Sequence, residues 1–103
     1  MKALLLALAP LTLVFASTAH ADMQLAQKNA CTACHAVDKK VVGPAFQDVA
    51  KKYQGQPDAI AKLVESIRQG GTGKWGSVPM PAQTALSEAD AKTLATWVLN
   101  GAK

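Results

Sequence analysis

The five residues Cys31-Thr32-Ala33-Cys34-His35 decide how this 103-residue chain is interpreted. They spell C-x-x-C-H, a pattern typical of covalent haem attachment. Cysteines three residues apart on a helical turn point the same way, so both thiols can reach the two vinyl groups of one porphyrin. His35 follows Cys31 by four positions and therefore lies on the same face. The spacing predicts a covalently bound haem c with His35 as an axial ligand of the iron.

A bare C-x-x-C pair has two other interpretations. It could act as a redox dithiol, or it could supply half of a zinc site. Zinc needs four ligands, and the sequence has no second C-x-x-C pair and no H-x-x-x-H pair. A dithiol of the thioredoxin kind belongs in a βαβ context, which the sequence does not indicate. Haem attachment is the favoured interpretation.

Residues 1–21 have the features of a secretory signal peptide. Lys2 supplies the positive charge, an apolar run extends from Ala3 to Ala16, and Ala19-His20-Ala21 forms a small-x-small cleavage pattern. The run is short for a transmembrane helix, which needs about 20 apolar residues. We expect cleavage after Ala21, a single mature domain of residues 22–103, a periplasmic location and no stable membrane insertion.

Cleavage would leave His35 as the only histidine, so the second axial ligand cannot be a histidine of the same chain. A methionine, another side chain, water or an external ligand must take that position. Met23 and Met80 are the methionines that remain after residue 21. Met23 lies beside the new N-terminus and is expected to pack in the core.

The charge of the chain is only mildly positive, with a formal net charge of +4 at pH 7. The lysines form no dense tract, and an exported protein rarely meets nucleic acid. These features argue against a nucleic-acid partner.

Four short helices are expected, and no segment alternates like a strand. Ile60, Leu63, Val64 and Ile67 recur at helical spacing, and Ser87 with Asp90 forms an N-terminal capping pattern. The expected helices run from Asp22 toward Asn29, from Ala45 to Tyr53, from Pro57 to Gly70 and from Ser87 to Asn100. The sequence therefore predicts an all-α fold around one cofactor.

The segment from Gly70 to Pro81 is rich in glycine and proline and cannot be a regular helix or a central strand. It nevertheless carries Trp75 and Met80, large apolar side chains that are costly to leave exposed. Met80 could be a core methionine under a loop, or it could bind the iron opposite His35. Because no spare histidine exists and the Met/His pair is common in cytochromes c, the ligand interpretation is favoured.

The chain resembles the short bacterial class I c-type cytochromes of the cytochrome c-551/c-552 group, from Met23 to Lys103. The residues that carry the resemblance are the C-x-x-C-H motif, Val42-Gly43-Pro44-Ala45, Asp48 to Tyr53, Gly73 to Pro81 and Leu94 to Leu99. The resemblance implies a compact all-α fold with one mostly buried haem c. It also implies that Cys31 and Cys34 attach the haem and that His35 and Met80 are the axial ligands.

Two further contacts are implied by the resemblance alone. The proline that corresponds to Pro44 offers its carbonyl to the ring N–H of the ligand histidine. The tryptophan that corresponds to Trp75 lies near a haem propionate. Trp97 has no such role and is expected in the core.

The chain departs from the group at two positions. Relatives often have asparagine where Gln83 stands, which affects a hydrogen bond to the methionine sulfur. Some relatives have a basic residue in place of Ser66, where it pairs with a propionate. Arg68, two residues further along the same helix, is the candidate to replace it.

These features predict a soluble electron carrier, not an enzyme, that docks transiently with larger redox proteins as electron donor and acceptor. Lys39, Lys40, Lys51, Lys52 and Lys74 could form a basic rim that attracts acidic partners, or they could be an ordinary solvated surface. The alternative function is a haem enzyme or sensor whose sixth iron position is open or labile, with Gln83 as the only suggestive polar group.

Overall fold

The computed structural model describes residues 7–13 and 18–103. In this part of the chain the elements are helices, and the all-α prediction is confirmed. They are α1 (Thr18–Lys28), the short 3-10 turn η1 (Cys31–Ala33), α2 (Phe46–Tyr53), α3 (Ala59–Gln69) and α4 (Glu88–Leu99). The described residues contain no strand, and two isolated bridges pair His35 with Lys40 and Gly71 with Met80.

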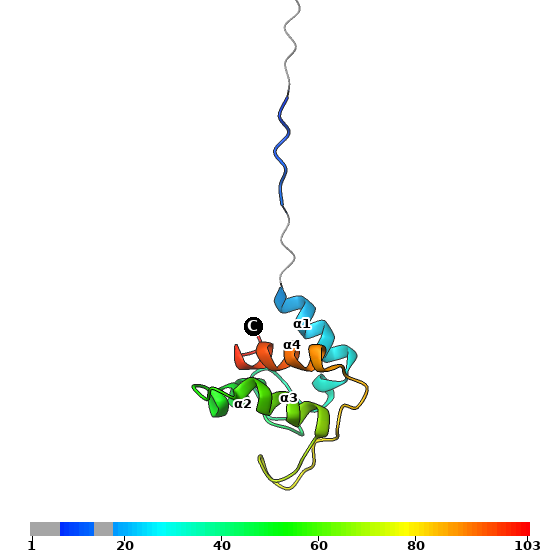
Figure 1. Ribbon diagram of the computed structural model, residues 1–103, viewed down its shortest axis with the longest axis vertical. Helices are drawn as coiled ribbons and strands as arrows, with labels where there is room; N and C mark the ends of the chain where they lie inside the picture. Colours follow the sequence, from blue (N-terminus) through cyan, green and yellow to red (C-terminus); the bar gives the residue numbers. More distant parts are fainter. Residues whose placement is uncertain (1–6, 14–17) are drawn as a thin grey trace, which may run out of the picture.

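Helix α4 is the centre of the packing. It lies between α1 on one side and α2 and α3 on the other (Figure 1), and it contacts all three. The side chains predicted to line its inner face are buried, and so is Trp97, which is only 3% exposed. The buried residues of α4 are Ala91, Leu94, Ala95, Trp97 and Val98. They meet Phe46, Val49 and Tyr53 of α2 and Ala59 and Leu63 of α3 in a single core.

The start of α4 follows from its sequence. The Ser87 hydroxyl accepts a hydrogen bond from the backbone N–H of Asp90 at 3.1 Å, which satisfies one of the free donors at the helix N-terminus. Helix α4 ends at Leu99, and Gly101 follows with a φ of 85°, a conformation that glycine adopts without strain. The predicted N-cap and helix end are both confirmed.

Two helix starts differ from the sequence prediction. Helix α1 begins at Thr18, not at Asp22, because Ala19 and Ala21 favour helix and extend it toward the N-terminus. Helix α3 begins at Ala59, not at Pro57, because Pro57 and Asp58 lie in a turn. In that turn the Ala59 N–H donates to the Gln56 carbonyl at 3.2 Å.

Residues 1–6 and 14–17 of the predicted signal peptide lie outside the described residues. Of its described part, Leu8 and Leu11 are 93% and 88% exposed and belong to no core. Among the helices that the structure describes, none has the length and apolar character needed to cross a membrane.

Candidate functional site

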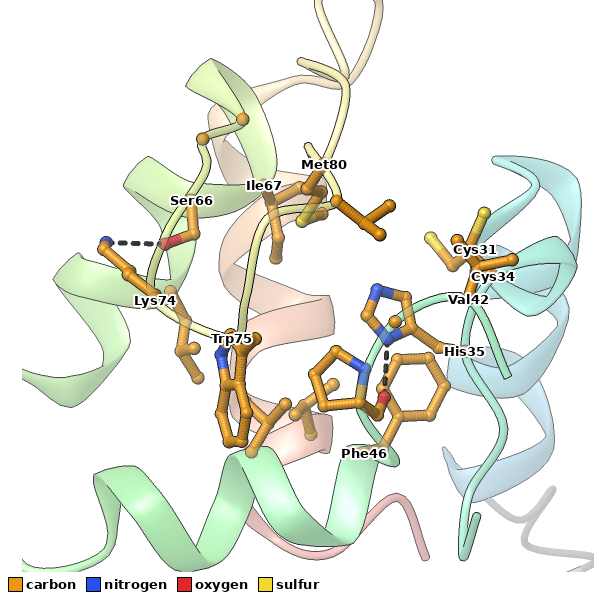
Figure 2. Close-up of a pocket in the computed structure, with 18 of the residues that line it drawn as sticks. Cys31, Cys34, His35, Val42, Phe46, Ser66, Ile67, Lys74, Trp75 and Met80 are labelled. Atoms are coloured by element: carbon orange, nitrogen blue, oxygen red, sulfur yellow. Dashed lines mark hydrogen bonds between the residues drawn. The ribbon is translucent and has the colours of Figure 1, made fainter. Parts of the chain in front are cut away.

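A cavity of about 520 Å³ opens between η1, α2, α3, α4 and the loop from Gly70 to Pro81. Its volume falls within the range of roughly 300–1,000 Å³ that is usual for pockets that enclose small molecules. All six residues singled out from the sequence line it: Cys31, Cys34, His35, Pro44, Trp75 and Met80. Figure 2 shows the two cysteines together at one end, with Ser66 and Lys74 at the other.

The two cysteines lie on a tight turn. Ala30 precedes it with φ 59° and ψ 20°, and the Cys34 and His35 N–H groups both donate to the Cys31 carbonyl, at 3.2 and 2.9 Å. In a 3-10 turn, side chains three residues apart lie directly above one another, which brings the two thiols together. Burial raises the pKa of the Cys31 thiol, and the neighbouring Cys34 adds to this, so Cys31 stays protonated at neutral pH.

The His35 ring is held by a hydrogen bond. Its Nδ1 lies 2.7 Å from the carbonyl oxygen of Pro44. A carbonyl oxygen only accepts, so Nδ1 must carry the proton and donate. In the neutral ring, Nε2 then keeps a free lone pair, which can bind a metal or accept a hydrogen bond.

The face of the same ring is held by aromatic packing. His35 stacks on Phe46 with the ring centroids 5.2 Å apart and 21° between the planes. Phe46 in turn meets the buried Trp97 edge to face, with centroids 5.3 Å apart. The orientation of His35 is therefore connected through α2 to the core of α4.

Gly43 completes the support of His35. A Cβ atom added at Gly43 would lie 2.5 Å from His35 Cε1 and 2.9 Å from Nδ1, closer than such atoms approach. Only a residue without a side chain lets the backbone pass this close to the ring.

Met80 is fixed through its backbone. Its N–H donates to the Gly71 carbonyl at 2.8 Å, and the Gly71 N–H donates back to the Met80 carbonyl at 3.0 Å. This pair closes the loop that carries Trp75. Gly70 precedes it with a φ of 68°, and a Cβ atom there would collide with the Met80 carbonyl oxygen. Glycine is required at position 70 both for its conformation and for this close approach.

Trp75 and Lys74 lie at the end of the cavity away from the cysteines (Figure 2). Trp75 is 42% exposed, and the Lys52 ammonium lies 4.4 Å from the centroid of its ring, a cation–π distance. The Lys74 ammonium donates to the Ser66 hydroxyl at 3.2 Å.

Two expectations about polar groups need correction. Arg68, the candidate to replace a basic residue at Ser66, is exposed and does not line the cavity, whereas Lys74 does. Gln83 does not line the cavity either, and its backbone N–H donates to the Ile67 carbonyl at 3.0 Å. The contact between Lys74 and Ser66 could not be predicted, because the two residues belong to different segments that meet only in the folded chain.

Phe46 and Gly43 were also missed as parts of the site. Neither residue was among the predicted site residues, although Gly43 belongs to a segment that carries the family resemblance. The position of Gly43, between the C-x-x-C-H motif and Pro44, was the available signal for a close backbone approach.

Four helices around a cavity that contains a C-x-x-C-H turn define a small all-α protein of the c-type haem class. A family model described as Cytochrome c matches residues 23–102, and the chain belongs to this family.

Relatives confirm the resemblance to the c-551/c-552 group. The chain is 51% identical over 87 residues to cytochrome c-552 of Nitrosomonas europaea, covering 84% of each chain. It is 50% identical over 84 residues to cytochrome c-551 of Allochromatium vinosum, covering 82% of this chain and 89% of that one. The crystal structure of wild-type Nitrosomonas europaea cytochrome c552 matches with a TM-score of 0.74 at 50% identity, over 76% of this chain and 96% of that one. The class I cytochrome c fold is thereby confirmed, and the homologues indicate a monohaem electron carrier.

Membership of the family implies one covalently bound haem c, and the cavity residues fit this group. Two thiols lie together at one end, and the His35 Nε2 is free of the bond to Pro44. Much of the remaining lining is apolar, including Val49, Leu63, Ile67, Leu94 and Val98. Such a lining suits a large apolar macrocycle.

The contact at Gly43 gives a testable prediction. Gly43→Ala should displace the His35 ring and lower the free energy of unfolding of the haem-loaded protein by about 1–3 kcal/mol, as overpacking does. Denaturant unfolding and the optical spectrum of the haem measure the two effects. Gly55→Ala is the matched control, because φ is 80° there but nothing lies within 4 Å of the added Cβ. It should lower stability through backbone strain alone and leave the spectrum unchanged. An altered spectrum in both variants, or in neither, would contradict the role of Gly43.

Proposed function

We propose that this chain is an exported carrier that passes single electrons between larger redox proteins. In this proposal Cys31 and Cys34 hold haem c through two thioether bonds, and His35 and Met80 bind its iron from opposite sides. The observation that carries the proposal is that one cavity is lined by all four side chains, although Met80 lies far along the chain from the other three.

His35 suits its role because its ring is oriented before any iron is bound. The donated bond from Nδ1 to Pro44 selects the tautomer whose Nε2 lone pair is available. Such a bond also makes the imidazole a stronger donor, and Phe46 and Gly43 restrict its rotation. Pro44 is therefore proposed as the supporting contact of the ligand histidine.

Met80 suits its role because both backbone hydrogen bonds to Gly71 limit how far its side chain can move. The haem iron, when bound, supplies the one-electron couple between the ferric and ferrous states. A thioether ligand favours the ferrous state and raises the reduction potential. The apolar lining acts in the same direction, because it disfavours the extra positive charge of the ferric state.

The alternative, an enzyme or sensor with an open sixth position, has less support. It would need a polar group close to Met80 that could act on a bound molecule. Gln83, the candidate for this role, does not line the cavity, and its backbone is held by Ile67. The carrier therefore remains the better proposal.

Replacement of Met80 tests the ligation. Met80→Ala should abolish the far-red absorption band of the oxidised protein, lower the reduction potential and allow carbon monoxide to bind the reduced form. Each effect follows from loss of the thioether ligand. Met23→Ala is the matched control, because Met23 packs against the core and does not line the cavity.

The unmodified protein and Met23→Ala should both show the band, and their reduced forms should not bind carbon monoxide. Carbon monoxide binding by the unmodified protein would instead mean a labile sixth position, and the enzyme or sensor would become the better proposal.

Export is a separate part of the proposal. We propose that cleavage after Ala21 releases a periplasmic protein of residues 22–103. The exposed Leu8 and Leu11 support this, and so does the match of the family model, which begins at residue 23. The cut would remove the first four residues of α1 and leave the Asp22 carboxylate at the new start of the helix, where negative charge is favourable.

The intact mass of protein recovered from a bacterial periplasm tests this cleavage. The mass should equal that of residues 22–103 plus one haem. The full-length mass, or a different N-terminus, would contradict the predicted site. An Ala21→Arg variant, whose large charged side chain is unsuited to the cleavage site, should accumulate uncleaved.

Docking with partners is proposed to use the mouth of the cavity. Lys40 and Lys74 line it, Lys39, Lys51 and Lys52 are exposed, and the apolar Val42 and Val78 are exposed on the lining. An apolar contact surrounded by positive charge suits brief encounters with acidic redox proteins.

Electron transfer to small complexes of opposite charge tests the basic rim. The rate with an anionic iron cyanide complex should fall as salt rises from about 0.01 M to about 1 M, because the Debye length shrinks from roughly 30 Å to roughly 3 Å. The rate with a cationic cobalt ammine complex should rise. A Lys39→Gln/Lys40→Gln variant should weaken both trends, whereas Lys92→Gln on α4 should not. The same salt dependence for both complexes would contradict the proposal.

A further inference from the structure

Two lysines from different segments lie near the end of the cavity opposite the cysteines. The Lys74 ammonium lies 3.2 Å from the Ser66 hydroxyl of α3. The Lys52 ammonium of α2 lies 2.9 Å from the Lys74 carbonyl oxygen and 4.4 Å from the centroid of the Trp75 ring. Of the two, Lys74 lines the cavity, and Figure 2 shows it beside Ser66.

Neither charge is paired with a carboxylate. Within the described part of the chain, the single salt bridge joins Lys62 to Asp58 at 3.4 Å. An ammonium group on the lining of a cavity, with no carboxylate paired to it, favours an anionic group in a molecule bound there. The arrangement therefore points to an anionic group at this end of the cavity.

The chemistry of haem c indicates which anion this is. Thioether bonds form at the two vinyl groups on one edge of the macrocycle, and the two propionates project from the opposite edge. If Cys31 and Cys34 attach the haem, the carboxylates must face the end of the cavity away from the cysteines. Lys74 and Ser66 lie at that end (Figure 2).

We infer that Lys74, held in place by Ser66, is the cation that pairs with a haem propionate in this chain. It takes the place of the basic residue that Ser66 does not supply, and Lys52 adds a second positive charge behind Trp75. Lys74 acts as a positioning residue and does not touch the iron. This inference rests on the proposed attachment of haem at Cys31 and Cys34.

The pairing has a consequence for the reduction potential. An ionised propionate stabilises ferric iron, so the potential falls as the pH rises through the pKa of that propionate. A neighbouring ammonium favours the ionised form and lowers this pKa, which leaves the potential flat around neutral pH. The other ionisable groups on the cavity lining are Lys40, Asp48 and Tyr53, besides the cysteines and His35. Asp48 is the one carboxylate among them.

The experiment measures the reduction potential of the haem-loaded protein from about pH 4 to pH 9. This range covers both ordinary and raised pKa values of carboxyl groups. NMR of the propionate methylene groups follows the same titration directly. In Lys74→Gln, the pH at which both signals change should move upward by on the order of one pH unit, because the nearby positive charge is lost. Ser66→Ala should give a smaller shift in the same direction.

Two controls distinguish other causes. Lys92→Gln removes an exposed lysine that does not line this cavity, and it should leave both titrations unchanged. In Asp48→Asn, the reduction potential and the propionate NMR signals should change at the same pH as in the unmodified protein. Equal effects of Lys74→Gln and Lys92→Gln, or loss of the titration in Asp48→Asn, would overturn the inference.

The far-red band separates this inference from the proposed ligation. If Lys74→Gln moves the propionate titration while the band is retained, both hold. If the unmodified protein lacks the band but Lys74→Gln still moves the titration, the ligation by Met80 fails and the inference stands. If the band is present and the titration does not move, the inference alone fails.

Discussion

The packing of His35 on Phe46, and of Phe46 on Trp97, connects the haem-binding turn to the helical core. Because of this stacking, the orientation of the His35 ring is determined by Phe46, whose position depends on the packing of α2 against α4. Cys31 and Val37, on either side of His35, also pack against this core. The bond to Pro44 and the missing side chain at Gly43 complete the support. The site is therefore stable to the extent that the core is.

The second half of the site depends on backbone geometry instead of core packing. The loop from Gly70 to Pro81 is largely exposed, with Val78 at 61%, and contains no helix or strand. Lys74 of this loop accepts a hydrogen bond from Lys52 of α2 and donates one to Ser66 of α3. The order of this loop also comes from the paired bonds between Gly71 and Met80 and from the bond between Gln83 and Ile67. Glycine at position 70 permits both the turn and the close approach to Met80. The two halves of the site therefore restrict His35 and Met80 by different means.

Much of this organisation could be predicted from the sequence. The helical spacing in α3 and α4, the Ser87 cap and the glycine-rich loop each have local causes, and local causes can be read from neighbouring residues. The convergence of Cys31, His35 and Met80 on one cavity was predicted from haem chemistry, through the motif and the lack of a second histidine. Contacts between distant segments could not be predicted in this way. No pattern in neighbouring residues indicates that Phe46 stacks on His35 or that Lys74 reaches Ser66. Arg68 stands two positions after Ser66, which corresponds to a rotation of about 200° around the helix. Its side chain therefore leaves the helix on another side and does not line the cavity.

The central claim is that Met80 and His35 hold the haem iron between them. The most direct test is the NMR spectrum of the reduced, haem-loaded protein with labelled methionine methyl groups. A methionine that binds the iron lies over the face of the macrocycle, whose ring current shields it strongly. The Met80 methyl signal should move far upfield, while the Met23 signal should stay near its usual position. Both signals near the usual position would contradict ligation by Met80.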